Sequence, residues 1–123
     1  MEFEPLSGRV IGCAIEVHKQ LGPGLLESVY RVCFAHELTA AGISCETEKA
    51  IAVHYKGIDL TCGFRMDMLV ESDLVIEIKA VEILLPVHET QLLTYLKLSG
   101  LKKGLLINFN SRVLRNGIRR LVL

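Results

Sequence analysis

Apolar residues recur at helical spacing through the first forty positions of the chain. Their three- and four-residue spacing predicts a helix over residues 8–21, with Ser7 as its N-cap. The Gly-Pro-Gly stretch at 22–24 ends this helix. The same spacing predicts a second helix from Leu25 to about Ala41. Two helices are therefore expected before any strand.

Three strands are predicted next. Residues 44–55 and 58–70 carry β-branched and aromatic side chains, and they flank a turn at Lys56-Gly57. Leu74–Ala80 is a third, short strand that follows a polar turn at 71–73. Because short turns join all three segments, we expect an antiparallel meander.

A helix and two further strands complete the expected order. Apolar residues at helical spacing predict a helix over 87–99, after Pro86 and before Gly100. Gly104–Phe109 is an apolar strand, so the strand–helix–strand order predicts a right-handed crossover and a parallel pair. The Asn-Gly pair within 115–118 predicts a tight hairpin near the end. The pattern indicates an α/β fold in the order α-α-β-β-β-α-β-β.

Composition fits one globular domain over residues 1–123. Half of the residues are apolar, and the 14 Lys and Arg balance the 14 Asp and Glu. The balance is uneven along the chain, because residues 101–123 contain six basic and no acidic side chains. This basic C-terminal segment is either a solubilising surface or a surface that faces phosphate, and charge alone does not decide between them.

The cysteines favour a reducing environment. The four of them are too widely spaced for a zinc knuckle or a C-x-x-C redox pair, and nothing before them in this sequence resembles a signal peptide; they are Cys13, Cys33, Cys45 and Cys62. We expect buried thiols in a soluble cytoplasmic protein. No apolar run approaches the roughly 20 residues that a membrane helix needs.

The two strands on either side of 71–73 have a well-defined register in this prediction. A turn at 71–73 pairs Met68 with Ile76 and Met66 with Ile78, which makes one face of the strand pair wholly apolar. A shift by one residue would destroy this pattern, because strand side chains alternate with a period of two.

The same register predicts a polar cluster on the other face. It places Asp67 opposite Glu77, with Lys79 two residues further along that face. Facing carboxylates repel each other, so something must compensate for them within an apolar sheet. A divalent cation such as Mg²⁺ or Mn²⁺ would do so, and Lys79 would then orient a metal-activated water or stabilise charge on a phosphate. The alternative is an ordinary solvated strand face.

Two helices carry further polar candidates. Glu27 lies near the start of the second helix, with Tyr30 three residues on and therefore on the same side. Glu27 is either part of a site or simply a charge that complements the helix N-terminus. His88, Gln91 and Tyr95 share one face of the helix after the strands, which is either an amphipathic polar face or a second wall of the site.

A known family matches these residues in order. The stretch Gly24-Leu-Leu-Glu27-Ser-Val-Tyr30 resembles the signature of the GxxExxY proteins, which belong to the PD-(D/E)XK nuclease superfamily. The resemblance extends over nearly the whole chain, through Arg65-Met-Asp67, Glu77-Ile-Lys79, Gln91 to Tyr95 and Gly104 to Phe109. It implies a restriction-endonuclease-like α/β/α sandwich around a mixed central sheet.

The resemblance also implies roles for individual residues. Asp67 and Glu77 would be metal ligands and Lys79 the catalytic lysine. Glu27 would be a further acidic residue that takes part in catalysis and metal binding. Gln91 and Tyr95 would correspond to the Q-x-x-x-Y helix of exonuclease-like branches. One departure is Met66, which stands where the superfamily name has proline but where no ligand is needed.

These observations together predict a Mg²⁺- or Mn²⁺-dependent nuclease that acts on DNA, or on RNA, through metal-activated water. The candidate nucleic-acid contacts are Tyr30, Lys102, Lys103, Arg112, Arg115, Arg119 and Arg120. So small a domain offers little surface for a duplex, so we expect a homodimer or a larger complex. The rival interpretation is a non-catalytic module that keeps the fold to bind nucleic acid or protein, and a junction-resolving nuclease is a third.

Overall fold

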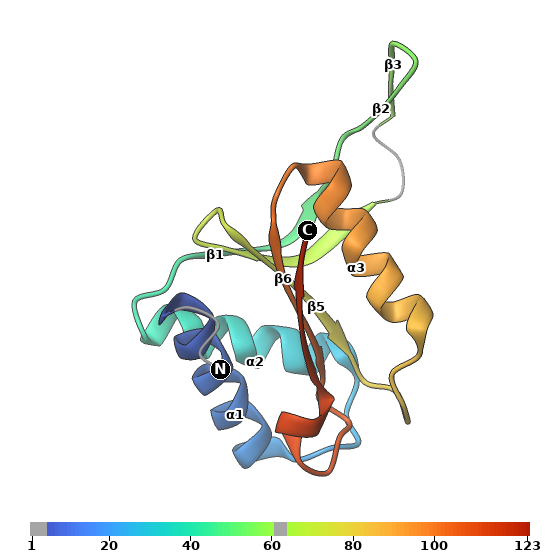
Figure 1. The fold of residues 1–123 in the computed structure, drawn as a ribbon. Coiled ribbons are helices and arrows are strands. Elements are labelled where there is room, and N and C mark those ends of the chain that lie inside the picture. Colours follow the sequence, from blue (N-terminus) through green and yellow to red (C-terminus); the bar gives the residue numbers. More distant parts are fainter. Residues whose placement is uncertain (1–4, 61–63) are drawn as a thin grey trace.

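The computed structural model, which describes residues 5–60 and 64–123, is a mixed sheet covered by helices on both faces (Figure 1). The sheet has five strands in the order β1-β4-β5-β6-β7. Helices α1 and α2 pack on one face and α3 packs on the other. The predicted α/β/α sandwich is thereby confirmed.

The first two helices follow the predicted apolar stripes. Helix α1 spans Pro5–Leu21 and α2 spans Glu27–Ala40. The one difference concerns Ser7, which was expected to cap the first helix. It lies within α1 and is fully buried, because the helix extends back to a proline that suits a first turn.

The sheet contains the predicted meander and the predicted parallel pair. Its strands are β1 Cys45–Ala50, β4 Arg65–Val70, β5 Leu74–Lys79, β6 Lys103–Asn108 and β7 Ile118–Val122. Strands β1, β4 and β5 are antiparallel neighbours, β5 and β6 are parallel, and β7 is antiparallel to β6. Helix α3, Pro86–Ser99, connects β5 to β6.

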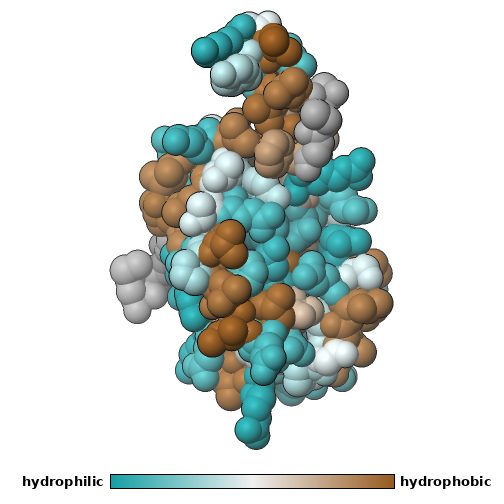
Figure 2. All heavy atoms as spheres, turned by 90° about the vertical axis from the view of Figure 1, so that its right-hand side faces the viewer, coloured by the Kyte–Doolittle hydropathy of each residue, from teal (hydrophilic) through white to brown (hydrophobic). Residues whose placement is uncertain are grey.

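The first predicted strand pair is divided in the structure. Instead of two long strands, β1 and β4 pair in the main sheet, and a separate hairpin of β2 Val53–Tyr55 and β3 Ile58–Leu60 projects beyond it (Figure 1). The Lys56-Gly57 turn is confirmed, with positive φ at both residues as a tight hairpin turn requires. Figure 2 shows this hairpin standing out above the α3 side of the molecule.

The tight hairpin predicted at 115–118 is wrong. A short 3-10 helix, η1 Leu114–Gly117, leads instead into β7, and the φ angle of Gly117 is not positive. Glycine is needed here because of a close approach. A Cβ atom on Gly117 would lie 2.1 Å from Ser111 Oγ and 2.8 Å from the Asn108 carbonyl oxygen.

Two hydrophobic clusters lie on the two sides of the sheet. The first packs α1 and α2 against side chains such as Met68 and Ile76, which pair across β4 and β5 as predicted. The second packs α3 against Val75 and Leu106. Met66 was predicted to share the face of Met68, but it packs in the second cluster, because regular β4–β5 pairing ends at Met68.

The cysteines are less buried than expected. Cys13, Cys33 and Cys45 are free thiols of intermediate exposure, and Cys62 lies outside the described residues. Within residues 5–60 and 64–123, no helix is long and apolar enough to cross a membrane.

Candidate active site

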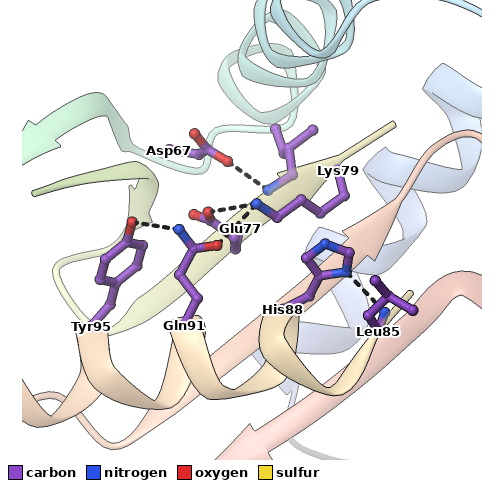
Figure 3. Close-up of polar contacts among 8 residues, drawn as sticks. Asp67, Glu77, Lys79, Leu85, His88, Gln91 and Tyr95 are labelled. Carbon is purple, nitrogen blue, oxygen red and sulfur yellow. Dashed lines mark hydrogen bonds and ion pairs between the residues drawn. The ribbon is translucent and has the colours of Figure 1, made fainter. Parts of the chain in front are cut away.

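The predicted polar cluster forms on the α3 side of the sheet (Figure 3). In β5, Ile76 and Ile78 point into the first hydrophobic cluster, so Glu77 and Lys79 point the other way, toward α3. Asp67 joins them from β4, as Figure 3 shows. Strand alternation therefore brings the three residues together without any special loop.

The contact between Asp67 and β5 differs from the predicted strand pairing. No backbone pair joins residues 67 and 77; instead, the Ile78 backbone N–H donates to Asp67 Oδ2 at 2.7 Å. The Asp67 carboxylate thus accepts the hydrogen bond that a β4 backbone carbonyl would accept if the regular strand pairing continued. This bond holds the Asp67 side chain beside Glu77, which is the juxtaposition that the sequence predicted.

Glu77 is the most unusual group in the site. Its residue is only 4% exposed, and Oε1 has no hydrogen-bond partner among the described residues. Burial and the negative charge of Asp67 raise the pKa of Glu77 from 4.5 to about 8, although the Lys79 ammonium opposes the shift. A buried carboxylate oxygen without a partner costs folding energy, so it needs a proton or a cation.

Lys79 is held between Glu77 and α3. Its Nζ lies 3.6 Å from Glu77 Oε2 and donates to Gln91 Oε1 at 2.9 Å. Gln91 Nε2 in turn donates to the Tyr95 hydroxyl at 3.1 Å, which fixes the orientation of the amide. Burial and the Glu77 charge raise the pKa of the Tyr95 phenol. The helix therefore positions an ammonium group directly beside the two carboxylates.

His88 precedes these residues on the same helix but does not join the cluster. Its Nδ1 accepts a hydrogen bond from the Leu85 backbone N–H at 2.9 Å (Figure 3). This bond closes the N-terminal turn of α3, where backbone N–H groups lack partners within the helix. His88 is thus a capping residue, and it stabilises the turn from which Gln91 is presented.

A comparison with known families identifies the superfamily of this chain. A family model of the PD-(D/E)XK nuclease superfamily matches residues 4–121. The chain belongs to the PD-(D/E)XK nuclease superfamily. Neither the curated proteins nor the solved structures give a match. Membership supports a nuclease-type function, and Asp67, Glu77 and Lys79 follow the order of carboxylate, carboxylate and lysine in the superfamily name.

Glu27, predicted as a third metal ligand of this superfamily site, is not gathered with the other two carboxylates. No three His, Cys, Asp or Glu side chains come close enough to hold a metal in the parts of the chain that the structure describes. Glu27 is exposed in the first turn of α2, and it lines a groove together with Ala80, the residue after Lys79. The structure places it beside the end of β5 instead of within the carboxylate pair.

Tyr30 was predicted to contact nucleic acid, and the structure contradicts this. The residue is fully buried, and its ring stacks on Phe109 with centroids 4.7 Å apart. Its hydroxyl donates to the Gly22 carbonyl at 2.6 Å and accepts from the Leu25 N–H at 3.1 Å. Tyr30 therefore fastens the loop between α1 and α2, from which Glu27 follows.

The lysines predicted as nucleic-acid contacts lie at the opposite end of the sheet from the candidate site. Lys103 pairs with Leu74 at the start of β5, whereas Lys79 pairs with Asn108 at the other end. Lys103 also forms an ion pair with Asp73 at 3.1 Å. Lys102 precedes Lys103 and is exposed at that same distant end. Neither lysine lies beside the candidate site, because that site is at the C-terminal end of the parallel strands β5 and β6.

The predicted arginines are divided between two sides of the sheet. Arg119 lies in one row with Leu106 and Glu77 across three strands, so it faces the α3 side about 10 Å from Glu77. Arg120, next along β7, faces the α1 side. Arg112 and Arg115 are exposed around η1, near the end of β6.

One positioning residue escaped prediction. Asn108 is 2% exposed and makes two hydrogen bonds with the Val81 backbone. Its Oδ1 accepts from the N–H at 3.0 Å, and its Nδ2 donates to the carbonyl oxygen at 2.9 Å. Asn110 adds a bond to the same carbonyl and accepts the Gly24 N–H at 2.9 Å. These amides join the segment after Lys79 to the loop before Glu27. A polar residue at the end of an apolar strand was the available signal.

Proposed function

We propose that this protein is a divalent-metal-dependent nuclease that hydrolyses phosphodiester bonds of DNA. One observation carries the proposal: the buried Glu77 carboxylate has an unpartnered oxygen, with Asp67 on one side and the Lys79 ammonium on the other. RNA is the alternative polymer, which the assay below separates from DNA.

The donor set fits Mg²⁺ or Mn²⁺. Two carboxylates that face each other in a partly closed site suit hard cations, which complete their coordination with water and phosphate oxygens. A cation shared by Asp67 and Glu77 would also remove the repulsion that now raises the pKa of Glu77. When bound, it would supply Lewis-acid activation of water and would offset negative charge on the phosphate.

The protein's own residues contribute position and charge. Lys79 would place its ammonium group against a phosphate oxygen or the attacking water, stabilising the charge that develops during hydrolysis. Gln91 and Tyr95 would keep that ammonium in place through the two hydrogen bonds at 2.9 and 3.1 Å. Glu27 would contribute from the edge of the site, where it lines a groove together with Ala80.

Cleavage assays test the proposal directly. Linear duplex, circular duplex, single-stranded DNA and single-stranded RNA are incubated with the protein and either Mg²⁺ or Mn²⁺. We expect cleavage of DNA that Asp67→Asn, Glu77→Ala and Lys79→Met each reduce by 100-fold or more. The control is Glu46→Gln, an exposed acid on β1 whose partner is Lys49. Equal activity in Glu77→Ala and wild type would refute the site.

Metal binding separates a nuclease from a binding module. Mn²⁺ or Mg²⁺ should raise the melting temperature of the wild type, and Asp67→Asn should abolish that shift. If both proteins respond alike, the non-catalytic module becomes the better interpretation. Sedimentation with and without DNA tests the proposed homodimer, which would present two sites to the two strands of a duplex.

A further inference from the structure

A groove with a cationic rim lies outside the candidate active site, between the end of α1 and η1. Its lining residues are Ile15, His18, Lys19, Arg112, Val113, Leu114 and Arg115. We call it the α1–η1 groove. Three of these side chains are exposed cations, and none of the described residues that line it is acidic. Lys19 and His18 were not among the residues that the sequence indicated.

The three cations of this groove form no ion pair with an acidic side chain of the described residues. Within the described ranges, the ion pairs of the protein involve neither Lys19 nor Arg112 nor Arg115. By contrast, Lys79 and Lys103 both lie against carboxylates. Three uncompensated positive charges around one groove produce a positive potential that attracts an anion.

The groove is built on well-anchored elements. His18 Nε2 is hydrogen-bonded to the Ser111 carbonyl oxygen at 2.7 Å, which joins the last turn of α1 to the segment before η1. Leu114 is buried in the first hydrophobic cluster and anchors η1 from below. Ile15 and Val113 remain 41% and 59% exposed, so the floor is partly aliphatic. The cations therefore surround a fixed surface.

The groove and the active site lie at the same end of the sheet. Strand β6 ends at Asn108, which pairs with Lys79, and Arg112 follows four residues later. One inter-strand spacing plus four extended residues places the backbone at Arg112 within about 20 Å of that at Lys79. In Figure 1, η1 and the end of α1 lie at the end of the sheet where β5 leads into α3.

We propose that the α1–η1 groove binds backbone phosphates of the nucleic acid that the active site cleaves. The proposal rests on the proposed function, because it assigns both surfaces to one substrate. A reach of at most about 20 Å corresponds to no more than about six base pairs, since phosphates along one strand advance about 3.4 Å per base pair. Flexible Lys and Arg side chains at this distance from the active site can contact the evenly spaced phosphates of a nucleic-acid backbone. Such contacts do not depend on the base sequence.

Binding at several salt concentrations tests the proposal. Fluorescence anisotropy of a labelled 20-base-pair duplex is measured without divalent cations, so that no cleavage occurs. The test variant is Lys19→Gln/Arg112→Gln/Arg115→Gln. The matched control, Lys49→Gln/Lys56→Gln/Lys97→Gln, removes three cations elsewhere on the surface. Both variants are first compared with wild type by thermal melting.

The groove variant should bind at least 10-fold more weakly than wild type in about 0.1 M salt. The slope of log K against log salt should fall by about 2 to 3, because each lost phosphate contact contributes about 0.9. The control should change the slope by less than about 1. Equal losses in the two variants would show only a general effect of net charge and would overturn the proposal.

Duplex length gives a second readout. A duplex of five base pairs can occupy the groove or the active site separately, whereas the 20-base-pair duplex can contact both at once, so the groove substitutions should weaken binding of the long duplex more than that of the short one. Equal losses at the two lengths would overturn the single-substrate geometry. Binding to anionic lipid vesicles or to an acidic peptide, with no groove-dependent binding to DNA, would assign the groove to another partner and would also overturn the proposal.

The outcomes for the two proposals are distinguishable. If the groove variant loses DNA affinity but no metal supports cleavage by wild type, the nuclease proposal fails while phosphate binding in the groove stands. If wild type cleaves DNA and Glu77→Ala does not, but groove and control variants bind alike, the groove proposal fails alone. With both proposals correct, the groove variant should lose cleavage efficiency mainly through a raised KM.

Discussion

Glu77 destabilises the metal-free protein as the pH rises. Its pKa is about 8 in the folded protein and 4.5 ordinarily, so the folded state holds a proton that the unfolded state has released between these values. The free energy of unfolding therefore falls as the pH rises from about 4.5 to 8, and the full penalty applies above 8. The shift places an upper bound of about 5 kcal/mol on this effect.

Glu77→Gln should therefore stabilise the metal-free protein at pH 8.5, with little effect at pH 4.5. Glutamine keeps the shape of the side chain but cannot ionise, so the buried negative charge disappears. Urea unfolding in EDTA at several pH values measures the difference. Glu46→Gln, a change at an exposed acid, should leave the pH profile unaltered. A variant that follows the wild-type profile would show that Glu77 is ionised at little cost.

Asn108 acts on the active site through the backbone of Val81. Asn108→Ala would remove the bonds at 3.0 and 2.9 Å, so the Val81 N–H would lose its side-chain partner and the carbonyl would keep only the Asn110 bond at 3.3 Å. We expect a loss of about 2 kcal/mol in unfolding free energy and faster hydrogen exchange at the Val81 amide. The exposed Asn116→Ala should cost less than about 0.5 kcal/mol. Unchanged hydrogen exchange at the Val81 amide would show that the Asn108 side chain does not hold this segment in place.

At the scale of elements, the seating of α3 on the sheet depends on a glycine. Gly104 in β6 lies under Leu92, and an added Cβ would meet that side chain at 3.0 to 3.1 Å. Because Leu92 follows Gln91 directly, a displaced helix also displaces the amide that holds Lys79. The close fit thus links helix packing to the active site.

Gly104→Ala should lower the unfolding free energy by about 1 to 2 kcal/mol and reduce cleavage several-fold. The control is Gly8→Ala in α1, where an added Cβ meets nothing within 4 Å. That change should stabilise the protein by about 0.5 to 1 kcal/mol, because alanine favours helix over glycine. Unfolding curves and the cleavage assay measure both variants. Equal stability of Gly104→Ala and wild type would show that the Leu92 side chain can move aside at little energetic cost.

Elements with a strong local period were predictable, and those fixed by tertiary contacts were not. Alternation alone predicted the β4–β5 pairing at Met68 and Ile76, and helical spacing predicted α1 to α3. The division between β1 and β2 has no local signal, because the two residues that separate them, Ile51 and Ala52, are not turn formers. Gly117 was predicted to be a turn residue, but glycine is needed there because the backbone lies too close to Asn108 for a side chain. No local sequence pattern reveals this contact.

The same distinction applies to the site. Asp67 on β4 and Glu77 and Lys79 on β5 are near in sequence and lie on the same face of two adjacent strands. Period-two alternation was therefore sufficient to group them. Glu27 and Tyr30 come from another element, and only the packed structure shows that one is exposed and the other buried. The positions of distant cations such as Lys102 likewise depend on the direction of β6.

At the scale of the whole molecule, the sheet couples the layer that carries the site to the layer that stabilises the fold. Strand β5 contributes Ile76 and Ile78 to the first cluster and Val75 to the second. Phe34 lies in the first cluster and Leu92 in the second, and both are fully buried. Both layers pack on the same sheet, so loss of one layer exposes one face of the strands on which the other layer also depends.

We therefore predict that both layers unfold in one transition. Phe34→Ala and Leu92→Ala should each lower the unfolding free energy, by about 3 to 5 and 2 to 5 kcal/mol, and each should shift the whole curve. Far-ultraviolet circular dichroism follows the helices, while tyrosine fluorescence responds to Tyr30 in one layer and Tyr95 in the other. Coincident curves in wild type and both variants would support cooperative unfolding. A separate early transition in Leu92→Ala would contradict it, and would mean that α3 can leave the sheet and dismantle the site while the rest of the fold persists.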